Sequence, residues 1–327
     1  MNSTRYHRHA PLALAAAGLL LSFAGLIHAA DAPRIRFERD DQHGRTAILI
    51  DGKEALVYRY GDGVDLPHYY PLRSPSGQSM LVEKTEPYPH HRAFWFADTV
   101  QLDGRRKASF YSALYSQVDA KDPASPFRDH VRQVEFASEQ CEGDRAELVT
   151  KLLWEMDSNV PVLDEQRRLR IVALESGEYF LDDTFTLTAA YGDVTFVSDA
   201  VHYAWPYLRI NETFNGEHGG TITNDLGQKG QAETNMKPAK WIDCSNTVDG
   251  TAEGLAVFQW PDGKEHRWLT RQYGCFGPRR PDEQSGKPFT LKRGESLTQR
   301  VGVLVHAGNV ESSRVAERYE QYVKGKL

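Results

Sequence analysis

The stretch Leu297–Gly308, LTQRVGVLVHAG, decides the fold class of this 327-residue chain. Its mostly apolar side chains occupy every second position and point to one side: Leu297, Gln299, Val301, Val303 and Val305. A period of two is the pattern of a β-strand that turns one face toward a core. The stretch therefore predicts a strand and not a helix.

Similar alternating or β-rich runs recur along the chain: residues 34–39, 47–51, 56–60, 147–156, 167–174 and 179–188. Between runs stand Asp-Gly pairs such as Asp51-Gly52 and Asp249-Gly250, which tolerate the positive φ of tight hairpins. No blade-length repeat indicates a propeller. We predict an all-β fold, a large antiparallel β-sandwich of the supersandwich kind, as a single domain over residues 31–327.

One helix is expected after the last strand. Apolar side chains recur at helical spacing between Glu311 and Lys324, and Gly325 follows at the expected stop. We expect this helix to pack across the outside of a sheet. Residues 211–238 and 274–287 are rich in Gly, Asn, Asp and Pro, and we expect them to form long loops.

The first 30 residues have the order of a secretory signal peptide. Arg5 and Arg8 precede an apolar run over residues 12–27, and Ala29 and Ala30 offer a cleavage point. We expect a mature protein that is periplasmic or secreted, with no stable membrane insertion after leader removal, since the run is short for a spanning helix.

Charge and cysteine content exclude several classes. The formal net charge is -6, from 39 Lys and Arg against 45 Asp and Glu, so nucleic acid is not an expected partner. The three cysteines, Cys141, Cys244 and Cys275, match no zinc spacing. We expect them to be structural, and whether two of them form a disulfide is left open.

The strongest candidate for chemistry is Pro89-His-His-Arg-Ala-Phe-Trp95. His90 and His91 stand at the entrance of an expected strand, where imidazoles transfer protons near neutral pH, and Arg92 can hold an oxygen or a carboxylate. Trp95 and Ala93 should face one side and Phe94 and Phe96 the other. The structural alternative is that His91 caps backbone groups and Arg92 pairs with an acid in the core.

A second candidate stretch, His202-Tyr-Ala-Trp-Pro-Tyr-Leu-Arg-Ile-Asn211, combines aromatic and polar side chains. His202 is a candidate proton carrier, and Tyr203 and Trp205 are candidate sugar-stacking residues. Pro206 places the stretch at an edge, bulge or strand terminus. Ordinary core packing is the alternative for Trp205.

Two further stretches supply candidates. Glu217-His-Gly-Gly220 and Lys237-Pro-Ala-Lys-Trp-Ile-Asp243 contribute His218, Lys240 and Trp241 for substrate binding and Asp243 as an acid or base. A solvated loop is the alternative.

The stretch His266–Gly277 contributes His266 and Tyr273 for binding and Arg271 for catalysis. Because Arg271 and Tyr273 are two apart, they share a face in an extended strand. A structural Arg–acid pair is the alternative.

Metal and other catalytic templates have little support. No HxH or HExxH spacing occurs after the leader, so we predict no cofactor and keep only a weak candidate ligand set for a divalent metal: His90, His91 and His202. GxSxG and GxxxxGK[ST] motifs are also missing from the sequence.

Six segments together resemble the soluble PmoA-like family of bacterial proteins: YPLRSPSGQ at 70–78, PHHRAFWFA at 89–97, EHGG at 217–220, AKWIDCS at 239–245, WLTRQYGCFG at 268–277 and LKRGESLTQRVGVLVHAG at 291–308. The resemblance runs in order from about Tyr58 to Tyr322. It implies a β-sandwich associated with carbohydrate catabolism. Family members often carry a further His near the position of Asp98, and this departure counts against a metal site.

The leading hypothesis is therefore an exported carbohydrate-active enzyme that uses His/Arg acid–base chemistry to hydrolyse, eliminate or epimerise a sugar derivative. His91, or His90, would be the general acid or base, Arg92 and Arg271 would hold an oxygen, and His202 or Asp243 would carry the complementary proton. The expected partner is a small-molecule or oligosaccharide substrate. One alternative is a non-catalytic sugar-binding protein whose groove is lined by Trp95, Trp205, Tyr203 and Tyr207, with Trp95 a substrate-binding residue in either case. The other is a metal-dependent hydrolase or oxygenase.

Overall fold

Two eight-stranded antiparallel sheets enclose the main core of the protein. The computed structural model describes residue 1 and residues 32–61, 63–113, 129–197 and 204–327. Residues 33–327 form one compact unit. Large side chains from both sheets meet in the core, where the ring centroids of Phe96 and Phe185 lie 4.4 Å apart. The predicted β-sandwich is confirmed.

The first sheet carries the Pro-His-His-Arg corner. Its strands, in spatial order, are β1 (Ile35–Asp40), β2 (Arg45–Ile50), β3 (Lys53–Arg59), β4 (His68–Leu72), β5 (Phe94–Trp95), β13 (Tyr207–Arg209), β18 (Cys275–Pro278) and β17 (Trp268–Thr270). Segments far apart in the sequence thus become neighbours at β5, β13 and β18.

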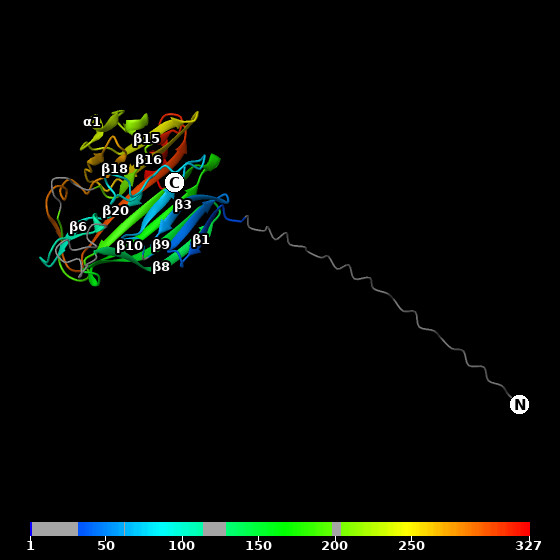
Figure 1. Ribbon diagram of the computed structural model, residues 1–327. Helices are drawn as coiled ribbons and strands as arrows, with labels where there is room; N and C mark the ends of the chain where they lie inside the picture. Colours follow the sequence, from blue (N-terminus) through cyan, green and yellow to red (C-terminus); the bar gives the residue numbers. More distant parts are fainter. Residues whose placement is uncertain (2–31, 62, 114–128, 198–203) are drawn as a thin grey trace. The chain divides into compact units, whose positions relative to one another are not determined.

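The second sheet contains the longest strands. Its order is β14 (Thr221–Asn224), β15 (Trp241–Val248), β16 (Thr251–Gln259), β20 (Ser296–Ala307), β11 (Tyr179–Thr188), β10 (Val160–Ala173), β9 (Arg145–Met156) and β8 (His130–Glu142). Figure 1 shows β20, β10, β9 and β8 crossing the molecule in succession. Val301, Val303 and Val305 face the main core, as the alternation of the last strand predicts.

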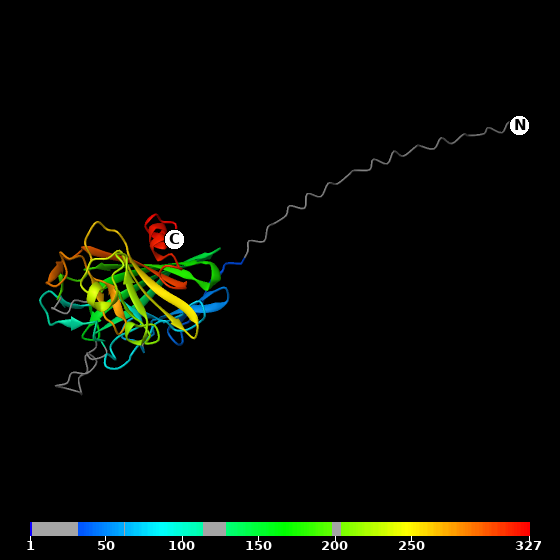
Figure 2. The same ribbon diagram turned by 90° about the horizontal axis from the view of Figure 1, so that it is seen from above.

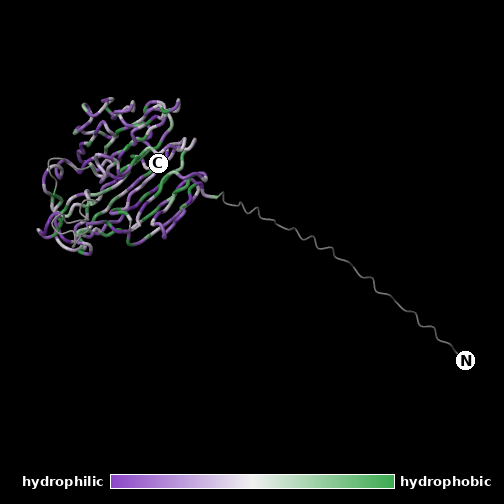
Figure 3. Tube along the Cα trace, in the orientation of Figure 1, coloured by the Kyte–Doolittle hydropathy of each residue, from purple (hydrophilic) through white to green (hydrophobic). Residues whose placement is uncertain are grey.

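A four-stranded sheet completes the β structure, in the order β19 (Phe289–Leu291), β12 (Val194–Phe196), β6 (Thr99–Leu102) and β7 (Ala108–Ser109). The tube coloured by hydropathy shows apolar residues concentrated along the strands and polar residues along the connections (Figure 3). At the hairpins, Asp51 and Gly52 both take positive φ, 50° and 78°, as the Asp-Gly signal predicts.

Helix α2 (Val315–Val323) lies within the predicted range and packs on the outer face of the second sheet. Its Tyr319 and Tyr322 contact Phe258. Figure 2 shows the helix, in red, on the outside of the strands. The residue before the helix, Arg314, has positive φ and caps no backbone group with its side chain.

The structure differs from expectation in two of the expected loops, and it shows the pairing state of the cysteines, which the sequence left open. The expected loop 211–238 contains β14, a 3₁₀ turn (Gly216–His218) and the short helix α1 (Gly230–Thr234), and the expected loop 274–287 contains β18. A second 3₁₀ turn spans Glu175–Gly177. Cys141, Cys244 and Cys275 are all free.

Candidate functional site

The Pro-His-His-Arg corner lies over the outer face of the first sheet. The ring of Phe94 lies 5.1 Å from that of Tyr69, whereas Trp95 points to the opposite face of the sheet and stacks on Tyr207 at 4.7 Å; all four rings belong to the main apolar cluster. Two backbone hydrogen bonds of 2.9 Å hold the corner, from the N–H of Val82 to the carbonyl of Arg209 and from the N–H of Lys84 to the carbonyl of His91. The predicted division of side chains between two faces is confirmed.

His91 is the buried centre of this region. Its side chain belongs to a residue that is only 3% exposed, and its ring stacks on Tyr88 at 4.8 Å. The ring Nε2 lies 2.9 Å from the hydroxyl oxygen of Tyr111. The ring Nδ1 is buried without a hydrogen-bond partner in the described part of the chain.

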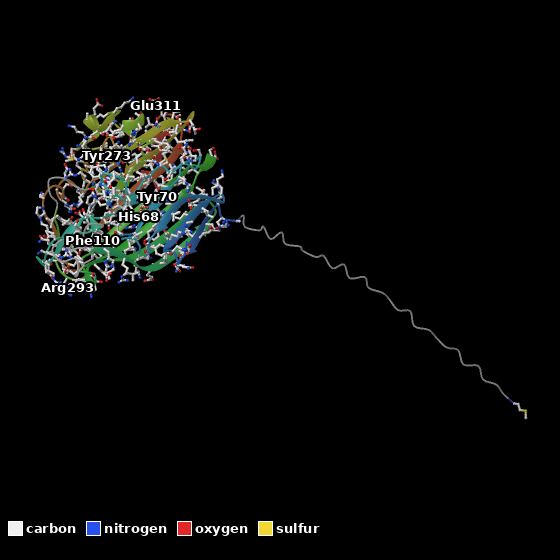
Figure 4. The ribbon with its side chains drawn as sticks, viewed as in Figure 1. His68, Tyr70, Phe110, Tyr273, Arg293 and Glu311 are labelled. Atoms are coloured by element: carbon white, nitrogen blue, oxygen red, sulfur yellow. The ribbon has the colours of Figure 1, made fainter. Side chains whose placement is uncertain are left out.

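Aromatic and cationic side chains surround His91. Tyr88 stacks on Tyr273 at 5.3 Å, and the Arg209 guanidinium lies 4.5 Å from the centroid of the Tyr273 ring. We call this group the His91 cluster, and its members are Tyr88, His90, His91, Trp95, Tyr111, Tyr207, Arg209 and Tyr273. Figure 4 labels Tyr273 in the turn before β18, and His68 and Tyr70 on β4 of the same sheet.

The floor and the rim of the His91 cluster differ in exposure. His91, Trp95, Tyr207 and Arg209 are buried. Tyr88, His90, Tyr111 and Tyr273 are half-buried and form the rim that solvent reaches. Tyr111 is therefore more accessible to solvent than His91.

The electrostatic setting keeps His91 neutral. Burial lowers the pKa of His91 to about 3, with smaller contributions from His90, Arg209 and Arg92. Burial and then the charge of Arg92 also lower the pKa of His90. No carboxylate among the described residues bonds to the His91 ring, so nothing offsets this loss of solvation.

Arg92 holds the corner in shape. It is 1% exposed, and its Nη1 donates to the carbonyl oxygens of Pro89 and His90, at 3.3 and 3.1 Å. Its Nη2 lies 3.3 Å from a carboxylate oxygen of Asp65. The structure thus places Arg92 in the acid pair that the sequence offered as the structural alternative to oxygen binding.

Four members of the His91 cluster were not among the predicted site residues of the enzyme: Tyr88, Tyr111, Tyr207 and Arg209. Tyr111 lies in Ala108–Ser112, a stretch with no motif. Arg209 stands two positions after Tyr207, so the two side chains share a face of β13. That period was visible in the sequence, and it is the signal that could have identified Arg209.

Arg271 and Tyr273 come together, but not in the expected way. Both lie in the turn between β17 and β18, closed by a 2.9 Å bond from the N–H of Gly274 to the carbonyl of Arg271. The expectation of a shared strand face is therefore wrong, because the chain reverses there. The Nη1 of Arg271 donates to Asn235 Oδ1 at 2.8 Å.

Asp243 lies away from the His91 cluster. It sits on β15 in the second sheet, where His306 Nε2 bonds to its Oδ2 at 2.7 Å, and both side chains are fully buried. Trp241 belongs to the apolar cluster beneath α2. The structure thus does not bring Asp243 to His91 as a complementary proton carrier.

Lys240 and His266 line a separate hollow of about 490 Å³ with Trp260 and Tyr319. His266 Nδ1 faces the carbonyl oxygen of Arg279 at 2.8 Å and its Nε2 faces Asp262 at 3.0 Å. His218 bonds through Nδ1 to Asn215 at 3.0 Å in an exposed turn. None of these three residues is a member of the His91 cluster.

Trp205 is a core residue that supports the site from below. It is 1% exposed, and its Nε1 donates to Asp98 Oδ2 at 2.9 Å. The packing alternative therefore describes it better than sugar stacking. Pro206 immediately precedes β13, the strand terminus expected from a proline. The predicted residues His202 and Tyr203, and the predicted leader, lie outside the described residues.

Metal ligands do not gather in the part of the chain that the structure describes: no group of three or more His, Cys, Asp or Glu side chains is placed to hold an ion there. Nor does any helix of the described residues have the length and apolar character to cross a membrane.

The chain belongs to DUF6807. This family of unknown function matches residues 45–320, which include every member of the His91 cluster. The match names no activity, and the PmoA-like resemblance stays a prediction beside it. No protein of curated function matches the chain.

Solved structures of carbohydrate enzymes share parts of the arrangement. An α-galactosidase of glycoside hydrolase family 36 from Geobacillus stearothermophilus is 10% identical, with a TM-score of 0.35 over 85% of this chain and 42% of that one. The α-galactosidase from Lactobacillus brevis is 10% identical, with a TM-score of 0.38 over 90% and 42%. A polysaccharide lyase is 15% identical, with a TM-score of 0.36 over 87% and 34%. The chain spans less than half of each, and similarities this distant indicate nothing about substrate.

Proposed function

We propose that the protein is an exported carbohydrate-active enzyme in which Tyr111 and His91 transfer a proton. The observation that carries the proposal is the 2.9 Å contact between the half-buried Tyr111 hydroxyl and the buried Nε2 of His91. A nucleophile or base and its partner within hydrogen-bond distance are the geometric sign of acid–base chemistry.

The two groups have different parts in this chemistry. Because His91 is 3% exposed, it reaches substrate through Tyr111 and not directly, which revises the expectation that His91 itself is the acid or base. In the tautomer that carries its proton on Nδ1, neutral His91 accepts the hydrogen bond from the phenol, so the phenol oxygen can take a proton from the substrate while its own proton moves to Nε2. In the reverse direction the same pair returns a proton.

The rim suits a sugar derivative. Half-buried Tyr88 and Tyr273 stack on each other beside His91 and Arg209, and ring edges and hydroxyls next to a cation suit the apolar patches and hydroxyl groups of a sugar derivative. Elimination, epimerisation and hydrolysis all need a proton taken or given at such a position.

A purely sugar-binding protein is less well supported. That alternative relied on Trp95, Tyr203, Trp205 and Tyr207 as a stacking platform. Tyr203 lies outside the described residues, and the other three are 1% exposed. Buried rings stabilise the sheet and present no flat surface to a ligand.

Turnover of a carbohydrate panel tests the proposal. The panel contains neutral oligosaccharides, uronate oligosaccharides and oxidised monosaccharides. We expect Tyr111→Phe and His91→Gln each to lower kcat about 100-fold or more, the usual contribution of a proton-transfer group, while the exposed His43→Gln leaves it unchanged. Unfolding curves establish that each variant is folded.

A pH profile separates proton transfer from a structural role. With a His91 pKa of about 3, wild-type turnover should be the same at pH 7 and pH 5. A catalytic histidine of ordinary pKa would become protonated over this range, and turnover would fall as the pH is lowered. The proposal would be overturned if the wild-type protein turned over none of the panel compounds, or if both variants kept wild-type turnover.

A further inference from the structure

Arg209 is a buried guanidinium with an unused edge. It is 8% exposed and projects from β13 toward Tyr273. The structure gives its side chain one hydrogen bond, from Nη1 to the carbonyl oxygen of Tyr273. Its Nε is buried and has no partner among the described residues.

Other arginines of this chain show what that edge can do. Arg34 pairs with Asp51 through Nε and Nη2, at 2.9 and 2.7 Å. Arg300 uses the same two nitrogens toward Asp182, both at 2.8 Å. Two parallel N–H···O bonds along the Nε–Nη2 edge are the preferred geometry for a carboxylate. On Arg209 this edge has no carboxylate partner in the described part of the chain.

No carboxylate among the described residues is paired with Arg209. Arg92, in the Pro-His-His-Arg corner, is paired with Asp65. Arg271, in the turn beside Tyr273, donates to the side-chain amide oxygen of Asn235. This is a positive region in a chain whose formal net charge is -6. A buried cation without an anionic partner costs several kcal/mol, so such a site favours an anion.

Two other buried donors face the same side of the sheet. The Nε1 of Trp95, which is 1% exposed, has no hydrogen-bond partner among the described residues, and neither has the Nδ1 of His91. Trp95, Tyr207 and Arg209 lie on the outer face of adjacent strands β5 and β13. Three incompletely bonded nitrogen-bearing side chains thus converge on one region.

We infer that the sugar derivative bound at the His91 cluster is acidic, and that Arg209 binds its carboxylate through the Nε–Nη2 edge. The inference rests on the proposed function for the site and adds the substrate class. A carboxylate supplies the two acceptors that this edge requires, whereas a neutral sugar hydroxyl supplies one and leaves the charge unpaired.

Isothermal titration with matched ligands tests the inference. The probes are trisaccharides of galacturonate, glucuronate and mannuronate, each with its carboxyl-reduced neutral counterpart. We expect wild-type protein to bind at least one acid about 30-fold more tightly than its neutral counterpart, in line with the loss on removing one partner of a buried charge pair. Arg209→Gln should abolish this preference, and Arg209→Lys should keep only part of it, because a point charge replaces the two-point edge.

The matched control is Arg293→Gln, which removes the same charge from an exposed position in the turn after β19. Figure 4 labels Arg293 far from Tyr273. This variant should keep the full preference for the acid. Unfolding curves identify a variant that fails to fold, and in that case Arg209→Lys still reports on the edge.

The outcomes separate this inference from the proposed function. Equal binding of acids and neutral counterparts, no binding of any acid, or an unchanged preference in folded Arg209→Gln would overturn the inference, even if Tyr111→Phe abolished turnover. A carboxylate preference that depends on Arg209, together with unchanged turnover in Tyr111→Phe and His91→Gln, would support the inference and overturn the proton-transfer proposal.

Discussion

His91 and His306 are both buried, at 3% and 0% exposure, yet their protonation differs. His91 contacts a phenol and feels arginine charges, and its pKa falls to about 3. At His306 burial also lowers the pKa, but the hydrogen bond and the charge of Asp243 outweigh it and raise the pKa above its ordinary value. The partner of a buried imidazole, and not burial alone, decides whether it carries a charge.

The difference assigns the two regions to different tasks. His306 and Asp243 form a fully buried ion pair in the second sheet, in which the carboxylate neutralises the imidazole. Among the described residues, no acid bonds to the His91 ring, which stays neutral, and the Nε1 of Trp95 and the Nε of Arg209 have no hydrogen-bond partner. One region stabilises the sheet, whereas the other keeps hydrogen-bonding capacity for a ligand.

The largest effect should be the loss of unfolding free energy of the protein at low pH that His91 causes. The unfolded pKa near 6.5 exceeds the folded pKa of about 3, so the unfolded state binds the extra proton as pH falls between these values. Wild-type protein should therefore lose up to about 5 kcal/mol of unfolding free energy from pH 6.5 to pH 3 through this residue.

Urea unfolding of His91→Gln measures this loss. The glutamine variant should fall less steeply with decreasing pH than wild type, and the exposed His43→Gln should follow wild type. Parallel curves for His91→Gln and wild type would show that the ring is not held neutral.

The next effect is the loss of the His306 partner. Asp243→Asn leaves a buried imidazole without its counter-charge, which should cost about 3 to 5 kcal/mol in unfolding free energy. Because the folded pKa of His306 is raised, the contribution is full below about pH 6.5 and declines as pH rises through the folded pKa. The comparison is urea unfolding at pH 6 and pH 9.

Asp249→Asn serves as its control, since this exposed residue occupies the turn of the same β15–β16 hairpin. A cost for Asp243→Asn that grows toward high pH would contradict a protonated His306.

A smaller effect follows removal of the Tyr111 hydroxyl. Tyr111→Phe leaves His91 Nε2 buried without its 2.9 Å partner, and the unmade hydrogen bond should cost about 1 to 3 kcal/mol. Thermal or urea unfolding at pH 7 measures it. Tyr191→Phe, at an exposed phenol bonded to Asp164, should cost less, and an equal cost would argue against a buried contact.

The smallest effect concerns the rim. Tyr88→Leu removes the stacking on His91 and Tyr273 at 4.8 and 5.3 Å, and should cost about 0.5 to 1.5 kcal/mol. Unfolding at pH 7 would give this value. Tyr88→Phe keeps both ring contacts and should be close to wild type; a loss equal to that of Tyr88→Leu would place the effect in the hydroxyl.

The fold was predictable because its signals are local. Alternation at Val301, Val303 and Val305 and the turns at Asp-Gly pairs arise from neighbouring residues. The exact span Tyr179–Thr188 of β11 was predicted for the same reason. The short strand Cys275–Pro278 was missed because it lies in a segment rich in turn-forming residues and pairs with distant β13 as well as with neighbouring β17.

The site was only partly predictable because it is assembled from distant segments. The motif around His91 identified the centre, but Tyr111 arrives from a stretch with no pattern and is recognised only by its contact. Asp243 looked equivalent to any other acid in sequence, and only the pairing of β15 with β16, and of β16 with β20, shows that it faces His306. Which polar groups share a side of a sheet depends on strand order, and that order cannot be read from neighbouring residues in the sequence.

The free cysteines described above have a practical consequence. Burial raises the pKa of Cys275 to about 12 and raises that of Cys244 further, so neither forms the reactive thiolate while the sheets are intact. Oxidants and alkylating dyes should therefore bypass both sulfurs in the native molecule and modify them when strands separate. Because one of these sulfurs lies in each large sheet, their modification reports the opening of either sheet.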